Sequence, residues 1–181
     1  DRDDPEILFN LGGVYLLKDM YESAADAFEK AIKIDPTDTT SYANLAAAYG
    51  MLKIYDKEIS ALKKVLMFEP ENKELRAALS NAYFNSDRFE EAIDAAICVV
   101  EIDEKDTQAY CNLGSCYAAQ NMIDEAIKTF NKASELAPDY SLPHTNLGTL
   151  YANMGRLETA IKEFKVSVSL NPQDAGAWLN L

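Results

Sequence analysis

One short phrase, Asn-Leu-Gly-x-x-Tyr, recurs along the sequence at multiples of 34 residues. It begins at Asn10, Asn112 and Asn146, so the two intervals are 102 and 34 residues. A fixed period of about 20–50 residues is typical of proteins that stack one small structural unit many times. This period therefore restricts the fold more strongly than any other feature of the sequence.

When the sequence is aligned on its prolines, it divides into five full repeats and the start of a sixth. Repeat position 7 is leucine and repeat position 11 is tyrosine in all five full repeats. The repeats span residues 5–38, 39–72, 73–106, 107–140 and 141–174, and the partial repeat spans 175–181. We expect residues 1–181 to form a single array, and we expect the array to continue beyond the partial repeat.

Each repeat is predicted to contain two helices, because apolar residues recur at helical spacing in both of its halves. Proline at position 32 ends the second helix in four repeats, since it lacks the N–H that the helix needs. The residue at repeat position 15 lies between the two predicted helices. In four of the five repeats it is Asp, Asn or Gly, which tolerate the left-handed conformation at a helix end. These separating residues are Asp19, Lys53, Asp87, Asn121 and Gly155.

Small residues at position 8 predict close contact between the two helices of a repeat. Gly12, Gly114 and Gly148 occupy this position, and we expect them to face the alanine at position 20 of the second helix. Glu58 replaces that alanine in the second repeat, so we expect it either to find a hydrogen-bond donor or to loosen the repeat. The third repeat departs most from the pattern, with Glu104 in place of proline, and is expected to stack least regularly.

The pattern resembles the tetratricopeptide repeat, which has this period and this signature. The fourth repeat carries the resemblance best, and the resemblance extends from residue 5 to residue 181. The matching residues of the fourth repeat are Tyr110, Leu113, Gly114, Tyr117, Ala126, Phe130, Ala133 and Pro138. The resemblance implies an all-α fold, a right-handed superhelical solenoid of antiparallel helix pairs.

The composition excludes several classes of function. The chain has 30 acidic and 17 basic residues and a net charge of −13, which disfavours nucleic acid and anionic lipid as partners. No apolar run is long enough to span a membrane. The three cysteines, Cys98, Cys111 and Cys116, do not form a metal-binding or disulfide pattern, so we expect a cytoplasmic, reducing location.

The sequence offers little material for catalysis. His144 is the one histidine and is expected to be a partly buried packing residue. No serine lies in a nucleophile elbow, and no phosphate-binding loop is present. Cys111, Cys116 and His144 provide three potential zinc ligands, whereas structural zinc sites use four. We therefore predict that the chain is not an enzyme and holds no metal or cofactor.

An asparagine row is the most distinctive candidate for a binding site. Position 6 is Asn10, Asn44, Ala78, Asn112, Asn146 and Asn180, and in the family that the chain resembles this position lines the concave groove. An asparagine amide offers both a donor and an acceptor, so it can pair with the N–H and C=O of a peptide. The resemblance thus implies a groove that holds an extended chain. The alternative is that asparagine here serves the fold itself.

Further groove residues are predicted near this row. Asn81 is expected to compensate for Ala78, Phe9 and Phe84 to act as apolar anchors, and Glu74 to add negative charge. The predicted function is a protein–protein interaction scaffold or adaptor, whose partner is a net basic segment with apolar anchors. Two alternatives stay open: a self-assembling module that forms homo-oligomers through its ends, and the substrate-recruiting region of a larger enzyme.

Overall fold

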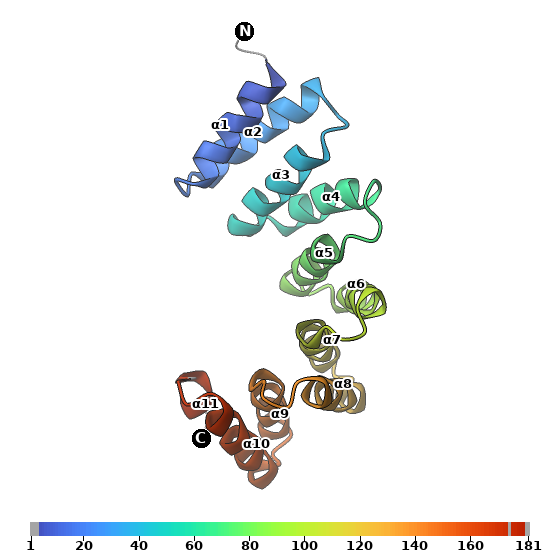
Figure 1. Ribbon diagram of the computed structural model, residues 1–181, viewed down its shortest axis with the longest axis vertical. Helices are drawn as coiled ribbons and strands as arrows, with labels where there is room; N and C mark the ends of the chain where they lie inside the picture. Colours follow the sequence, from blue (N-terminus) through green and yellow to red (C-terminus); the bar gives the residue numbers. More distant parts are fainter. Residues whose placement is uncertain (1–3, 174, 180–181) are drawn as a thin grey trace. The chain divides into compact units, whose positions relative to one another are not determined.

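The computed structural model describes residues 4–173 and 175–179 and contains eleven helices and no strand among them (Figure 1). The side chains of Ala175 and Ala177 lie outside this description. The chain divides into two compact units, Asp1–Arg88 and Phe89–Leu181. The division falls within the third repeat of the sequence, between its first and its second helix. No helix among the described residues is both long and apolar enough to cross a membrane.

The first unit contains two helical hairpins and one further helix. The hairpins are α1 with α2 and α3 with α4, and in Figure 1 the two helices of each lie side by side. Helix α2 also packs on α3, and α4 packs on α5, so each hairpin is covered by its neighbour. The helices are α1 (Pro5–Leu16), α2 (Tyr21–Ile34), α3 (Thr39–Met51), α4 (Tyr55–Leu66) and α5 (Lys73–Asn85).

The second unit repeats this arrangement. Helix α6 packs on α7, α7 pairs with α8, α9 pairs with α10, and α11 packs on α10. Its core includes Phe130 and Leu147, which are 2 % exposed. The helices are α6 (Phe89–Ile102), α7 (Thr107–Ala119), α8 (Ile123–Leu136), α9 (Leu142–Asn153), α10 (Leu157–Leu170) and α11 (Ala175–Leu179).

The turn inside each repeat has the same backbone conformation. The residue at position 15 takes a positive φ in all five repeats, as the sequence predicted, and even Lys53 adopts it. The next N–H then donates to the carbonyl of the tyrosine at position 11, as from Met122 to Tyr117 at 2.8 Å. This pattern closes the end of a helix with a left-handed residue. The five φ values are 57° at Asp19, 57° at Lys53, 59° at Asp87, 62° at Asn121 and 74° at Gly155.

Helices α1, α3, α5 and α7 begin at a capping side chain that the sequence analysis did not single out, whereas α9 begins at Ser141 without a side-chain cap. Asp38 Oδ1 accepts from the N–H of Thr40 at 3.0 Å, and Asp106 Oδ1 accepts from the N–H of Ala109 at 3.0 Å. Asp4 and Asn72 cap α1 and α5 in the same way. These caps satisfy backbone donors that have no partner within the helix. The signal was an Asp or Asn just before each of these four helices.

The glycines at position 8 contact a different residue from the one predicted. A Cβ atom on Gly114 would lie 2.6 Å from the ring of Phe130, so the nearest side chain is the phenylalanine at position 24, not the alanine at position 20. Gly12 and Gly148 face Phe28 and Phe164 in the same way. Glycine is needed here because a buried aromatic ring fills the space that a side chain would take. The predicted close contact is confirmed, with a different partner.

Glu58 occupies a half-buried position on α4, and its carboxylate has no hydrogen bond or ion pair to any residue that the structure describes. Its carboxylate lies next to Gly50 on α3. A Cβ atom on Gly50 would lie 2.9 Å from Glu58 Oε1. Burial raises the pKa of Glu58 above its usual value. No donor to the Glu58 carboxylate is therefore found among the described residues, and the expected loosening of the second repeat stays a prediction.

Candidate functional site

The predicted binding residues lie on the first helices of the repeats. In the first unit, α1 contacts α3, and in the second unit, α7 contacts α9, so neighbouring first helices share a face within each unit. We call this surface of each unit its amide face, defined by the position-6 residues Asn10 and Asn44 in the first unit and Asn112 and Asn146 in the second. Each of these side chains is exposed or half-buried. Asn180, the sixth member of the predicted row, lies outside the described residues.

In the first unit the asparagine amides are available to a ligand. Asn10 is exposed and Asn44 is half-buried, and neither side chain makes a hydrogen bond to a described residue. Asn81, which the sequence suggested as a substitute for Ala78, is exposed on α5. A structural asparagine would use its amide to satisfy neighbouring backbone groups. These side chains do not, which favours the binding interpretation over the structural one.

In the second unit, one asparagine is held by neighbours that the sequence analysis missed. Gln108 Nε2 donates to Asn112 Oδ1 at 2.9 Å, and the hydroxyl of Tyr140 donates to Gln108 Oε1 at 2.6 Å. This chain of hydrogen bonds leaves the Asn112 amide N–H groups without a partner among the described residues. Asn146 on α9 is half-buried and has no such neighbour. The available signal was Tyr140 at position 34, where the preceding repeats have Asp or Asn.

The predicted anchors have different surroundings. Phe9 is half-buried, and its ring centroid lies 5.9 Å from that of Phe28, so its orientation is fixed by the core. Phe84 is also half-buried, near the end of α5. Glu74 is exposed in the first turn of α5. Phe9 thus offers part of one ring to a ligand, and Glu74 offers a solvated charge.

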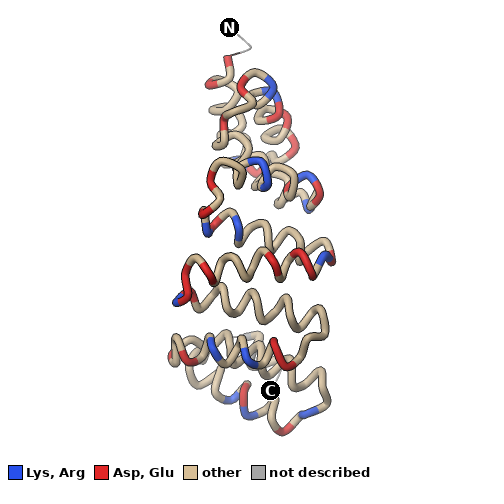
Figure 2. The backbone as a smooth tube through the Cα atoms, turned by 90° about the vertical axis from the view of Figure 1, so that its right-hand side faces the viewer, with Lys and Arg blue, Asp and Glu red and all other residues tan. Residues whose placement is uncertain are grey.

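Charge is distributed unevenly between the two kinds of helix. Helices α3, α7 and α9 contain no Lys, Arg, Asp or Glu, whereas all the second helices carry several charged residues (Figure 2). Among the described first helices of the full repeats, only α1 and α5 are charged, at Glu6, Lys73, Glu74 and Arg76. The asparagines at positions 44, 112 and 146 therefore lie on helices without charged residues, whereas Asn10 follows Glu6 by one helical turn on α1.

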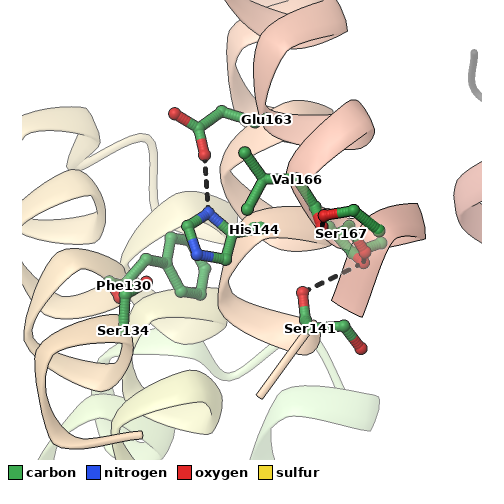
Figure 3. Close-up of polar contacts among 9 residues, drawn as sticks. Phe130, Ser134, Ser141, His144, Glu163, Val166 and Ser167 are labelled. Atoms are coloured by element: carbon green, nitrogen blue, oxygen red, sulfur yellow. Dashed lines mark hydrogen bonds and ion pairs between the residues drawn. The ribbon is translucent and has the colours of Figure 1, made fainter. Parts of the chain in front are cut away.

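The one histidine of the sequence, His144, pairs with a carboxylate of the neighbouring helix. His144 Nδ1 lies 2.8 Å from Glu163 Oε2, which joins α9 to α10 (Figure 3). The hydroxyl of the buried Ser167 pairs with Thr145 at 2.6 Å, not with the histidine. No cluster of three or more potential metal ligands occurs among residues 4–173 and 175–179. His144 is partly buried, as expected, but it also forms an ion pair with Glu163 when it is protonated.

Together these features define an all-α protein built from helical hairpins, with asparagine amides on its first helices. A family model described as tetratricopeptide repeat matches residues 5–38 and 107–140. A second model with the same description matches residues 27–59 and 129–162, so the two together cover more than half of the chain. The chain belongs to the tetratricopeptide repeat family. The predicted fold of antiparallel helix pairs is confirmed.

Solved structures of this class resemble the chain over most of its length. YrrB, described as a TPR protein with an unusual peptide-binding site, is 23% identical with a TM-score of 0.77, covering 99% of this chain and 92% of its own. MamA from Desulfovibrio magneticus RS-1 is 20% identical with a TM-score of 0.83, covering 94% and 97%. TTC0263, a thermophilic TPR protein in Thermus thermophilus, is 21% identical with a TM-score of 0.70, covering 97% and 96%. No curated protein sequence matches the chain.

Proposed function

We propose that this protein is an interaction scaffold that holds an extended segment of a partner protein on its amide face. The observation that carries the proposal is the set of asparagine amides at position 6, which are exposed or half-buried and of which three lie on helices without charged residues. Each amide can donate to a peptide C=O and accept from a peptide N–H. The scaffold would act as an adaptor or as the substrate-recruiting region of a larger enzyme. The peptide-binding site named for YrrB is consistent with this use of the fold.

The energetics require further contacts besides the amides. A hydrogen bond contributes about 1 kcal/mol net, whereas association costs about 4–15 kcal/mol in lost freedom. The asparagines alone would therefore give little affinity. Phe9 and Phe84 are the proposed apolar anchors, together with Asn81 and Glu74 at the edge of the row. We propose a net basic partner, since the molecule carries a charge of −13.

The proposal is tested by selecting binding peptides from a displayed library and titrating them calorimetrically into the native chain. The test variant combines Asn44→Ala, Asn112→Ala and Asn146→Ala. Because three hydrogen bonds are removed at about 1 kcal/mol each, we expect the dissociation constant to rise by about a hundredfold. Circular dichroism checks that the variant remains folded.

Asn131→Ala is the matched control. Asn131 is an exposed asparagine on the second helix α8, away from the amide face. This substitution should leave the peptide affinity unchanged. If the triple variant binds the selected peptides as tightly as the unaltered protein, the amide face does not read the peptide backbone and the proposal is wrong.

Self-association is a second candidate function, and a specific surface on α1 favours it. Ile7, Leu11 and Val14 are 51%, 40% and 47% exposed, whereas the equivalent residues of α3 are buried. A row of apolar side chains at this spacing fits the side of another helix. Light scattering that increases with protein concentration, and that Leu11→Ser abolishes, would support self-association.

We also propose a reducing, cytoplasmic location. The three cysteines are free thiols in the described structure, and two of them are buried in its core. Free buried thiols are typical of proteins from reducing compartments. Fractionation of cells that produce the protein, followed by detection with an antibody, would test the location directly.

A further inference from the structure

A pocket of about 380 Å³ opens beside the amide face in the first unit. It lies between the first turn of α1 and the loop that joins α2 to α3. Its lining residues are Pro5, Glu6, Phe9, Asp35, Asp38 and Thr40. The pocket therefore has one aromatic wall, three carboxylates and no basic lining residue.

The aromatic wall packs against the core. The ring of Phe9 lies against that of Phe28, with an angle of 58° between the two ring planes, and Phe28 is fully buried. Phe9 itself is half-buried, so part of its side chain is accessible from the pocket that it lines. The negative face of such a ring attracts a cation.

The carboxylates differ in their capacity for new hydrogen bonds. Asp38 is largely engaged, because it accepts from the backbone N–H groups of Thr40 and Ser41. Asp35 Oδ1 accepts from Thr37, and these bonds hold the pKa of Asp35 below its usual value, while its Oδ2 has no partner among the described residues. The side chain of Glu6 likewise has none. Asp35 and Glu6 can thus accept hydrogen bonds from a ligand in the pocket.

The fourth repeat supplies an independent observation, because the corresponding place there is occupied. Tyr140 stands at the position of Asp38, and its hydroxyl bonds to Gln108, which stands at the position of Glu6. Burial raises the pKa of Tyr140, so the phenol is partly covered by protein. In the fourth repeat, the location that corresponds to the pocket thus holds the planar side chain of Tyr140, which donates to the residue at position 2. In the first repeat, the short Asp38 leaves this location open.

We propose that the pocket binds the guanidinium group of an arginine side chain from the partner segment. Guanidinium is flat and cationic, so it can stack on Phe9 while its N–H groups donate to Glu6 and Asp35. The identification of the arginine with a partner protein rests on the proposed scaffold function. The affinity of the pocket for the guanidinium group does not, and it is tested separately.

The test is a nuclear magnetic resonance titration of the full chain with N-acetylarginine amide. Its counterpart is N-acetylcitrulline amide, which has nearly the same shape and no charge. We expect the arginine compound to shift the signals of the Phe9 ring and the Glu6 amide in a saturable manner, and citrulline to leave them unchanged. Equal shifts with both compounds, or shifts that avoid these two residues, would overturn the proposal.

Two variants locate the binding within the pocket. Glu6→Gln and Phe9→Leu should each weaken arginine binding by about three- to tenfold, since each removes one charged or aromatic contact. Glu22→Gln is the matched control, because Glu22 is an exposed acidic residue in the first turn of α2 and does not line the pocket. Unchanged binding in both pocket variants, with folding confirmed by circular dichroism, contradicts the assignment.

The result separates this inference from the proposed function. If the arginine compound binds in the pocket while the asparagine variant leaves the peptide affinity unchanged, the amide-face proposal is wrong and the assignment of the pocket as a guanidinium site is supported. If selected peptides depend on the asparagines but the arginine compound produces no shift at Phe9, the scaffold stands and the pocket assignment fails.

Discussion

Two consecutive glycines in α1 have different surroundings, and this difference can be measured. A Cβ atom on Gly12 would lie 2.6 Å from the ring of Phe28, whereas a Cβ on Gly13 would meet nothing within 4 Å. We expect Gly12→Ala to lower the free energy of unfolding by about 1–3 kcal/mol, because the buried ring has to move. Gly13→Ala should instead raise it by about 0.5–1 kcal/mol, since alanine favours the helix.

Urea denaturation of both variants provides the measurement, and each serves as the control for the other. The two substitutions are chemically identical and adjacent in the sequence. If they changed stability in the same direction, contact with Phe28 would not be the reason for glycine at position 8.

The cysteines should differ in their reactivity toward alkylating reagents. Burial raises the pKa of the Cys111 thiol to about 12, with a further contribution from Asp106. Because the thiolate is the reactive form, Cys111 should be inert at neutral pH in the folded protein. Cys98 is only partly buried and should react first. Mass spectrometry after treatment with iodoacetamide would identify the modified residue, and early modification of Cys111 would contradict the structure.

At the scale of a single hairpin, Glu58 is expected to reduce the stability of α3 and α4. The residue at this position is alanine in the other four repeats, where it is buried. We expect Glu58→Ala to raise the free energy of unfolding at neutral pH by about 0.5–2 kcal/mol, the usual effect of restoring a repeat consensus. Thermal unfolding, followed by circular dichroism, would measure it.

The gain from Glu58→Ala should depend on pH with a definite sign. Burial raises the pKa of Glu58 in the folded protein, so the folded state binds more protons than the unfolded state between the two pKa values. Glu58 therefore destabilises the protein most above its folded pKa, and this penalty disappears as the pH falls below the unfolded value. A gain that persists at acidic pH would indicate another cause.

The helical hairpins were predictable from the sequence, whereas their packing partners were not. Proline and the position-15 residues mark helix ends through local backbone chemistry, which a single repeat reveals. The contact between Gly114 and Phe130 depends on how two helices lie against each other, and periodicity does not specify that. The bonds from Tyr140 to Gln108 and on to Asn112 were missed for the same reason, since 32 residues separate the tyrosine from the glutamine.

At the scale of the whole molecule, stability should be a sum of local contributions. Each hairpin packs against its sequence neighbours, as α8 packs on α9 and α2 packs on α3. In such an arrangement, a repeat is stabilised by its own contacts and by those of the adjacent repeats. A defect in one repeat should therefore affect that repeat and its neighbours more than distant parts of the chain.

Gly148→Ala tests this at one end of the array. The new methyl group would collide with the ring of Phe164. Phe164 lies on α10 and packs against α9 at Gly148. We expect native-state hydrogen exchange to become roughly five- to hundredfold faster in α9, α10 and the adjacent α8, the range that a loss of about 1–3 kcal/mol implies. Exchange in α1 to α4 should remain unchanged, because those helices belong to the other unit. Equal acceleration along the whole chain would instead mean that all the helices unfold together, and the stability of the protein would then have to be treated as a single cooperative quantity.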